Sequence, residues 1–200
     1  MLAWRTRLES IGDVTAFDYA YMQLGRRSPD RLSGLIAAHR DALSQLRGRA
    51  RGPLFLIGKS MGGRIGCHVA LEEQVAGVIC LGYPLKSGTT GALRDEVLLA
   101  LRPPVLFVQG SRDPLCPLDL LEEVRGRMIA PSTLMVVAGG DHSLVVSAKN
   151  LKMAGDTQEH VDTRVLEAIE RYTAALIDAS SASYVGQVLG ERMTPKASKT

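Results

Sequence analysis

The chain has 200 residues, of which 46% are hydrophobic, and this is enough for one domain with a substantial core. Its net charge is only +3, and aromatic residues make up 4% of the chain. The densest basic group, Arg47, Arg49 and Arg51, lies in a glycine-containing connector. This composition argues against a nucleic-acid surface or a base-stacking platform.

The three cysteines have no C-x-x-C spacing, so we expect neither a zinc site nor a disulfide framework. The first residues contain no signal-peptide pattern, and no apolar stretch is long enough to cross a membrane. These features favour an intracellular protein, cytoplasmic or nuclear, that needs no metal or organic cofactor.

Short apolar runs alternate along the chain with amphipathic segments. The runs that we predict as strands are Val14–Phe17, Leu54–Ile57, Val75–Leu81, Val105–Gln109 and Thr133–Ala138. They are continuously apolar and rich in β-branched residues, which is typical of strands buried on both faces of a parallel sheet.

The amphipathic segments between these runs predict helices. The expected helices begin at Ser28-Pro29, directly after Ser60, at Pro117 (to about Met128) and at Gln158 (to Ala179). The alternation of predicted strands and helices indicates an open α/β sheet with right-handed crossovers. We expect one domain over residues 1–179 and a flexible polar tail over residues 180–200.

Residues 58–62, GKSMG, fit two incompatible motifs. A phosphate-binding loop, G-x-x-x-x-G-K-[ST], would need glycine where the chain has Pro53, and the next four residues form a predicted strand. The alternative is a G-x-S-x-G nucleophile elbow, in which a strand runs into a sharp turn and then a helix. The elbow is the better interpretation, with Ser60 as the nucleophile.

An elbow needs small residues beside the turn, and Gly58 and Gly62 supply them at positions −2 and +2. The helix that follows directs its positive end at the serine. The backbone N–H of Met61 is therefore a candidate donor to an oxyanion.

A serine hydroxyl needs a base and an acid to become a strong nucleophile. Asp113 follows the strand VLFVQ, and His142 follows the strand TLMVVA, in the chain order that this kind of site uses. Asp141 is an alternative acid. We expect it to serve in a turn instead, because the residue next to a histidine in the sequence rarely points at a nitrogen of that histidine's imidazole. Cys116 is a weaker alternative nucleophile because it lacks an elbow.

The remaining histidines are expected to serve packing or to lie on the surface; they are His39, His68 and His160.

The blocks GKSMGGR, GSRDPLCP and GGDHSL resemble the α/β-hydrolase-like family of the testis-expressed and NSL-complex subunit three proteins, which is related to the dienelactone hydrolases. The likeness runs from about Trp4 to Tyr172. It implies an α/β-hydrolase fold, an open and mostly parallel sheet flanked by helices, with Ser60, Asp113 and His142 as the catalytic triad. One animal branch of the family is a subunit of a histone-acetyltransferase complex.

By the same resemblance, Val14–Phe17 corresponds to the fourth strand of the fold, and the first three strands have no counterpart before Met1. We therefore expect an N-terminally truncated sheet of about five strands with an exposed edge. The loop after strand three, which supplies one of two oxyanion donors in this fold, also has no counterpart. Loss of one such donor lowers turnover by roughly 10²–10³.

Two functions follow as hypotheses. The first is a serine hydrolase that cleaves a small acyl ester or thioester, with activity impaired by the missing donor. The second is a non-catalytic hydrolase-fold subunit that binds a protein partner, in a chromatin-type complex, through its exposed sheet edge.

Overall fold

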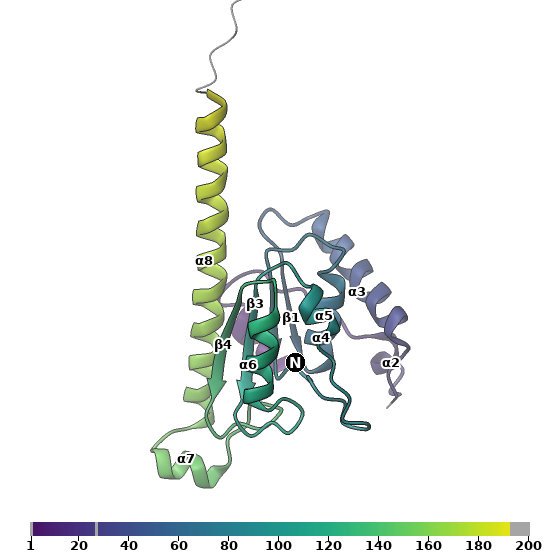
Figure 1. Ribbon diagram of the computed structural model, residues 1–200, viewed down its shortest axis with the longest axis vertical. Coiled ribbons are helices and arrows are strands. Elements are labelled where there is room, and N and C mark those ends of the chain that lie inside the picture. Colours follow the sequence, from purple (N-terminus) through teal and green to yellow (C-terminus); the bar gives the residue numbers. More distant parts are fainter. Residues whose placement is uncertain (1, 27, 193–200) are drawn as a thin grey trace, which may run out of the picture.

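The computed structural model describes residues 2–26 and 28–192, which form an open sheet with helices on both faces (Figure 1). The strands are all parallel and pair in the order β1-β2-β3-β4; their bounds are β1 (Phe55–Lys59), β2 (Gly77–Leu81), β3 (Val105–Gly110) and β4 (Ser132–Val137). Each strand overlaps one of the predicted apolar runs. The predicted α/β class and parallel sheet are confirmed.

Helices follow each of β1, β2 and β3 in the chain, as the alternation predicted, and the other helices precede β1 or follow β4. Their bounds are α1 (Leu2–Leu8), α2 (Ala20–Gln23), α3 (Leu32–Arg47), α4 (Met61–Val69), α5 (Glu96–Ala100), α6 (Leu118–Arg127), α7 (Ala148–Ala154) and α8 (Gln158–Arg192). No helix in the described ranges is both long enough and apolar enough to span a membrane.

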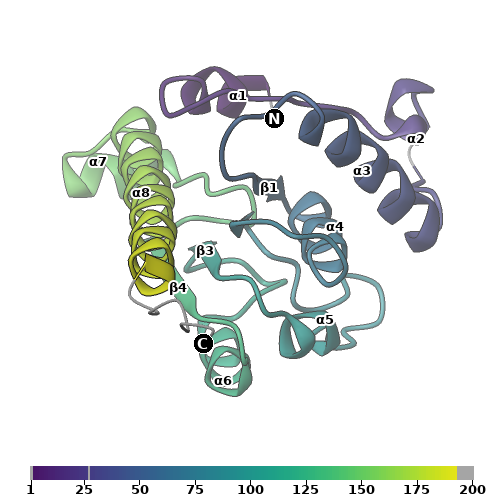
Figure 2. The ribbon, with the colours of Figure 1, turned by 90° about the horizontal axis from the view of Figure 1, so that it is seen from above.

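The two faces of the sheet are covered by different helices (Figure 2). Helices α3 to α6 bury one set of strand side chains, including Val78 and Phe107. Helices α1 and α8 bury the alternate set, including Ile79 and Val108. Because successive strand residues point to opposite faces, a strand covered on both sides buries side chains on both, which explains the continuous apolar runs.

Residues Val14–Phe17 do not form a strand, and the expectation of about five strands is wrong, since the described residues contain four. Val14 packs on the α1–α8 side of the sheet, while Tyr19 is buried on the α3–α4 side. The segment between them therefore crosses from one face to the other, and Thr15 to Asp18 are exposed. In the described residues no strand pairs with this segment, and β1 pairs only with β2.

Two helix boundaries differ from the expectation. Helix α3 begins at Leu32 rather than at Pro29, with no side-chain cap. Helix α8 continues to Arg192, so the part of the expected tail up to that residue is helical. The flexibility of residues 180–200 stays a prediction, and residues 193–200 lie outside the described ranges.

The junction of β1 and α4 is closely packed at two glycines. A Cβ at Gly58 would lie 2.2 Å from the backbone of both Gly62 and Gly63. A Cβ at Gly63 would lie 2.8 Å from the carbonyl oxygen of Gly58 and 3.3 Å from Cys80. A Cβ at Gly62, in contrast, would meet nothing within 4 Å. The expectation for Gly58 agrees with this packing, but the second sterically constrained position is Gly63, not Gly62.

His39 lies on the buried face of α3, in the packing role that the sequence predicted. Its Nδ1 is 3.3 Å from the hydroxyl oxygen of Tyr19, and its ring packs edge-on against Phe17. Burial lowers the pKa of His39 to about 4, because the charged imidazolium loses its hydration in the core. The folded protein therefore holds a neutral histidine.

We predict that replacing Gly58 by Ala lowers the free energy of unfolding by about 1–3 kcal/mol or more, because the new methyl group collides with backbone that cannot move aside. Gly62→Ala is the matched control. It sits in the first turn of α4 with open space around it, so its stability should stay equal or rise by up to about 1 kcal/mol. Urea unfolding of both variants measures this, and equal losses would contradict the packing described above.

We also predict a pH dependence of stability from His39. Between a pH of about 6.5 and about 4, the unfolded chain takes up a proton on this side chain and the folded protein does not. The free energy of unfolding should therefore fall by up to about 3 kcal/mol as the pH decreases through this window. In urea titrations at several pH values, His39→Leu should lose this contribution, whereas the exposed His160→Leu should keep it.

Candidate active site

Ser60 occupies a strained bend between β1 and α4. Its φ of 51° and ψ of −120° are unusual for a residue other than glycine. Two backbone hydrogen bonds hold the bend: the Ser60 N–H donates to the carbonyl of Leu81 at 2.9 Å, and the Arg64 N–H donates to the carbonyl of Ser60 at 3.2 Å. The strand–turn–helix arrangement of a nucleophile elbow is therefore present, and residues 55–59 are in a strand, not a phosphate-binding loop.

The side chains of Ser60, His142 and Asp113 form a hydrogen-bonded chain. The Oγ of Ser60 lies 2.7 Å from Nε2 of His142, and Nδ1 of His142 lies 2.7 Å from Oδ2 of Asp113. The carboxylate side chain is fully buried, while the imidazole is 25% exposed. The three residues come from loops at the carboxyl ends of β1, β3 and β4. The structure therefore brings together the three residues that the sequence predicted.

The loop that carries His142 is held by close backbone contacts. A Cβ at Gly82, whose φ is +65°, would lie 2.4 Å from the carbonyl oxygen of His142. A Cβ at Gly110 would lie 2.2 Å from the carbonyl oxygen of Asp141. Both positions need glycine because the loop lies directly on the ends of the neighbouring strands. No sequence pattern marked these two glycines as site residues.

Asp141 stabilises the same loop from within. Its Oδ1 accepts hydrogen bonds from the backbone N–H groups of Ser143 at 2.7 Å and Val145 at 2.9 Å. Lys59 reaches across from the elbow and donates to the hydroxyl of Ser143 at 3.0 Å. Asp141 is therefore a turn residue in this geometry, and Asp113 is the carboxylate at the imidazole.

The amide of Gln109 lies behind Asp113, and sequence reasoning missed it. Its Nε2 donates to Oδ2 of Asp113 at 2.6 Å, and its Oε1 accepts from the backbone N–H of Tyr83 at 3.0 Å. Gln109 is fully buried in β3. The available signal was a polar residue at the end of an otherwise apolar strand.

The start of α4 carries the candidate oxyanion donor, the backbone N–H of Met61. The Met61 N–H is in the first turn of the helix and donates to no backbone carbonyl outside it in the described residues. Such a group points out of the helix end and is free to donate to an anion.

The cysteines near the site are packing residues. Burial, followed by the charge of Asp113, raises the pKa of the Cys116 thiol to about 12. Cys67 and Cys80 lie with their sulfur atoms 3.7 Å apart, and both are fully buried. The contact with Cys67 and burial raise the pKa of Cys80 well above its ordinary value. Such thiols are poor nucleophiles.

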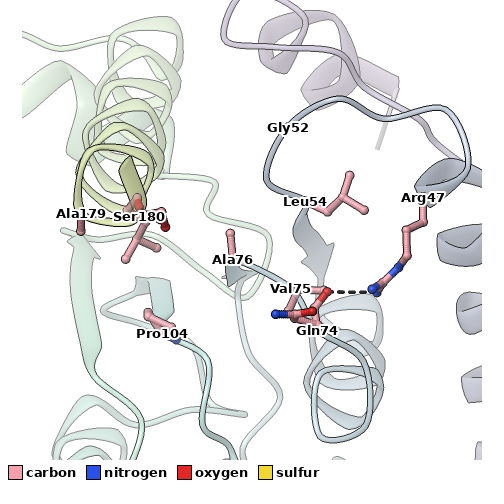
Figure 3. A pocket seen from close by; sticks show the side chains of 10 residues that line it. Arg47, Gly52, Leu54, Gln74, Val75, Ala76, Pro104, Ala179 and Ser180 are labelled. Atoms are coloured by element: carbon pink, nitrogen blue, oxygen red, sulfur yellow. Dashed lines mark hydrogen bonds between the residues drawn. The ribbon is translucent and has the colours of Figure 1, made fainter. Parts of the chain in front are cut away.

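Two cavities lie away from the triad. One, of about 590 Å³, opens at the amino ends of the strands, beside Leu54, Ala76 and Pro104 (Figure 3). Its arginine, Arg47, already donates to the carbonyl of Gln74. The other, of about 390 Å³, lies between β4, α7 and α8. Neither of these two cavities is lined by Ser60, Asp113 or His142.

Known structures share this fold. A protein of unknown function from Agrobacterium tumefaciens is 17% identical, with a TM-score of 0.59, 98% of this chain covered and 79% of the other. Est1E from Butyrivibrio proteoclasticus, solved with ferulic acid bound, is 15% identical, with a TM-score of 0.59 and coverages of 88% and 82%. Dienelactone hydrolase from Anabaena variabilis is 18% identical, with a TM-score of 0.50 and coverages of 72% and 58%. At these identities the likeness shows the fold alone.

Two sequence comparisons add to this. Protein sumv-2 from Caenorhabditis elegans is 33% identical over 101 residues, which are 50% of this chain but only 9% of that protein. The model of the alpha/beta hydrolase domain family matches residues 3–174. Because this match spans most of the chain, the protein belongs to the alpha/beta hydrolase domain family.

Proposed function

We propose that the protein is a serine hydrolase that cleaves an ester or thioester of a small acyl group. The observation that carries the proposal is the unbroken hydrogen-bonded chain from Ser60 through His142 to Asp113. The position of Ser60 on a strained elbow supports the same function, because the bend presents the hydroxyl at the carboxyl end of the sheet.

The reaction would begin with attack by the Ser60 Oγ on the substrate carbonyl carbon, while Nε2 of His142 accepts the hydroxyl proton. The carbonyl oxygen becomes an oxyanion, and the Met61 N–H donates to it. His142 then gives the proton to the leaving oxygen or sulfur, and the acyl group remains on Ser60 as an ester.

Water completes the cycle. His142 takes a proton from the attacking water, the acyl–Ser60 bond breaks, and the proton returns to Ser60 Oγ. Asp113 accepts the Nδ1–H throughout, which keeps Nε2 unprotonated in the neutral imidazole and stabilises the charged form. These steps use only side chains, backbone, substrate and water.

The resemblance to the testis-expressed and NSL-complex subunit three proteins extends the proposal to a subfamily. The blocks that carry it contain all three triad residues: GKSMGGR, GSRDPLCP and GGDHSL. On that basis we propose that the chain belongs to this subfamily.

A fluorophosphonate probe tests the hydrolase proposal. We expect the folded chain to be labelled at Ser60 and to hydrolyse para-nitrophenyl acetate. Ser60→Ala should abolish labelling, and Asp113→Asn should slow turnover by about 10⁴-fold because the wrong imidazole tautomer is favoured. Asp141→Asn is the matched control and should leave the rate far closer to that of the wild type, because asparagine keeps an Oδ1 that can accept the turn hydrogen bonds from Ser143 and Val145. Labelling that survives in Ser60→Ala would overturn the proposal.

A second candidate function, an interaction module in a protein assembly, is favoured by the outer edge of β1. Leu54 and Ser60 bond toward β2, so the backbone groups of the alternating residues Phe55, Ile57 and Lys59 face away from the sheet. Within the described residues, no strand pairs with them. An open edge of this kind can accept an added strand from a partner.

Hydrogen exchange tests the second candidate. In the isolated chain, the amides of Phe55, Ile57 and Lys59 should exchange much faster than those of Leu56 and Gly58, which face β2. Uniform slow exchange in a monomeric chain that rapidly hydrolyses para-nitrophenyl acetate would exclude an interaction role for this edge.

A further inference from the structure

Gln109 is a buried polar residue in a strand that is otherwise apolar. Every residue of β3 is buried, and Gln109 itself has no exposed surface. Burying an amide is unfavourable unless its donors and acceptors find partners. A hydrophobic residue of the same size would avoid this cost, so the presence of an amide at this position needs an explanation.

The orientation of this amide is fixed by its neighbours. The backbone N–H of Tyr83 can only donate, so the atom that faces it at 3.0 Å must be the amide oxygen. The amide nitrogen must then face Asp113, where it lies 2.6 Å from Oδ2. A flipped amide would place an N–H against an N–H and an oxygen against a carboxylate, so Gln109 can act here only as a donor to Asp113.

The donated hydrogen bond falls on the oxygen that also contacts the imidazole. Oδ2 of Asp113 receives both the Gln109 Nε2 at 2.6 Å and the His142 Nδ1 at 2.7 Å. The other oxygen, Oδ1, accepts from the Leu115 N–H at 2.8 Å. Donors on both oxygens hinder the carboxylate from rotating about its Cβ–Cγ bond.

We propose that Gln109 is a positioning residue for the triad: it anchors the Asp113 carboxylate so that Oδ2 stays aimed at Nδ1 of His142. This inference rests on the hydrolase function proposed above. Gln109 has no exposed surface, so it acts on the triad through its hydrogen bond to Asp113. The backbone of Tyr83, next to Gly82 beneath the His142 loop, thereby links the end of β2 to the acid.

Three variants separate this role from simple core packing. Gln109→Met keeps the length of the side chain but removes both hydrogen bonds. Gln109→Glu can still donate to Asp113, but only while the two carboxyl groups share a proton. Val108→Ala is the matched control, because it weakens the same strand on the opposite face and leaves the amide intact.

The first readout is the kinetics of fluorophosphonate labelling at Ser60. For Gln109→Met, we expect the maximal labelling rate to fall by about 10- to 100-fold, the range that corresponds to one lost hydrogen bond to a charged group. The probe concentration at half-maximal rate should not change. Val108→Ala should show the maximal labelling rate of the wild type at urea concentrations where the variant remains folded.

The second readout is pH. Two adjacent carboxyl groups resist ionising together, so the Gln109→Glu pair retains a proton to a higher pH than a lone carboxyl group. As this proton leaves, donation to Asp113 is lost and a second buried charge appears. On the pH plateau of the wild type, the rate of Gln109→Glu should therefore decline with rising pH, with circular dichroism confirming that the variant is folded.

The third readout needs no activity. The downfield proton resonance of the His142 Nδ1–H reports the hydrogen bond to Asp113, and it should shift or broaden in Gln109→Met but not in Val108→Ala. An unchanged resonance, or labelling as fast as that of the wild type, would overturn the role of Gln109. A wild-type chain that shows the resonance but is never labelled at Ser60 would instead refute the hydrolase function and leave the Gln109 contact established.

Discussion

The close contact between β1 and α4 is the constraint on which the candidate site depends. Gly58 and Gly63 let the backbone of the strand end meet the first turn of the helix, where a methyl group at either position would collide with backbone or with Cys80. The chain must reverse within one residue, and Ser60 takes the unusual backbone angles that result. The hydroxyl is thereby held outside the sheet, and the first N–H groups of α4 face the same space.

The parallel sheet supplies the other two groups of the triad. Its strands all end on one edge, so the loops after β1, β3 and β4 converge there although they are far apart in the sequence. Convergence alone does not set distances within hydrogen-bonding range. The contacts of Gly82 and Gly110 with the backbone of the His142 loop, together with the turn bonds of Asp141, bring the imidazole to its place.

The polar side chains of the site differ in how deeply they are buried. Asp113 and Gln109 lie in the core and are bonded to each other, whereas His142 keeps a quarter of its surface exposed where a substrate can reach it. The nearby thiol of Cys116 is buried, and burial together with the charge of Asp113 raises its pKa. Ser60, in contrast, combines partial exposure, a strained backbone and a hydrogen bond to an imidazole.

The sequence by itself determined the strand–helix alternation, the elbow at GKSMG and the order of Ser60, Asp113 and His142, because periodicity and turn chemistry are local properties of the chain. Only the tertiary structure decided which segments become neighbours. Val14–Phe17 has the composition of a strand, but a strand also needs a partner backbone, and none pairs with it in the described chain. Likewise, Gly63 rather than Gly62 faces the neighbouring backbone, and Gln109 meets Asp113, because both contacts arise from packing between elements.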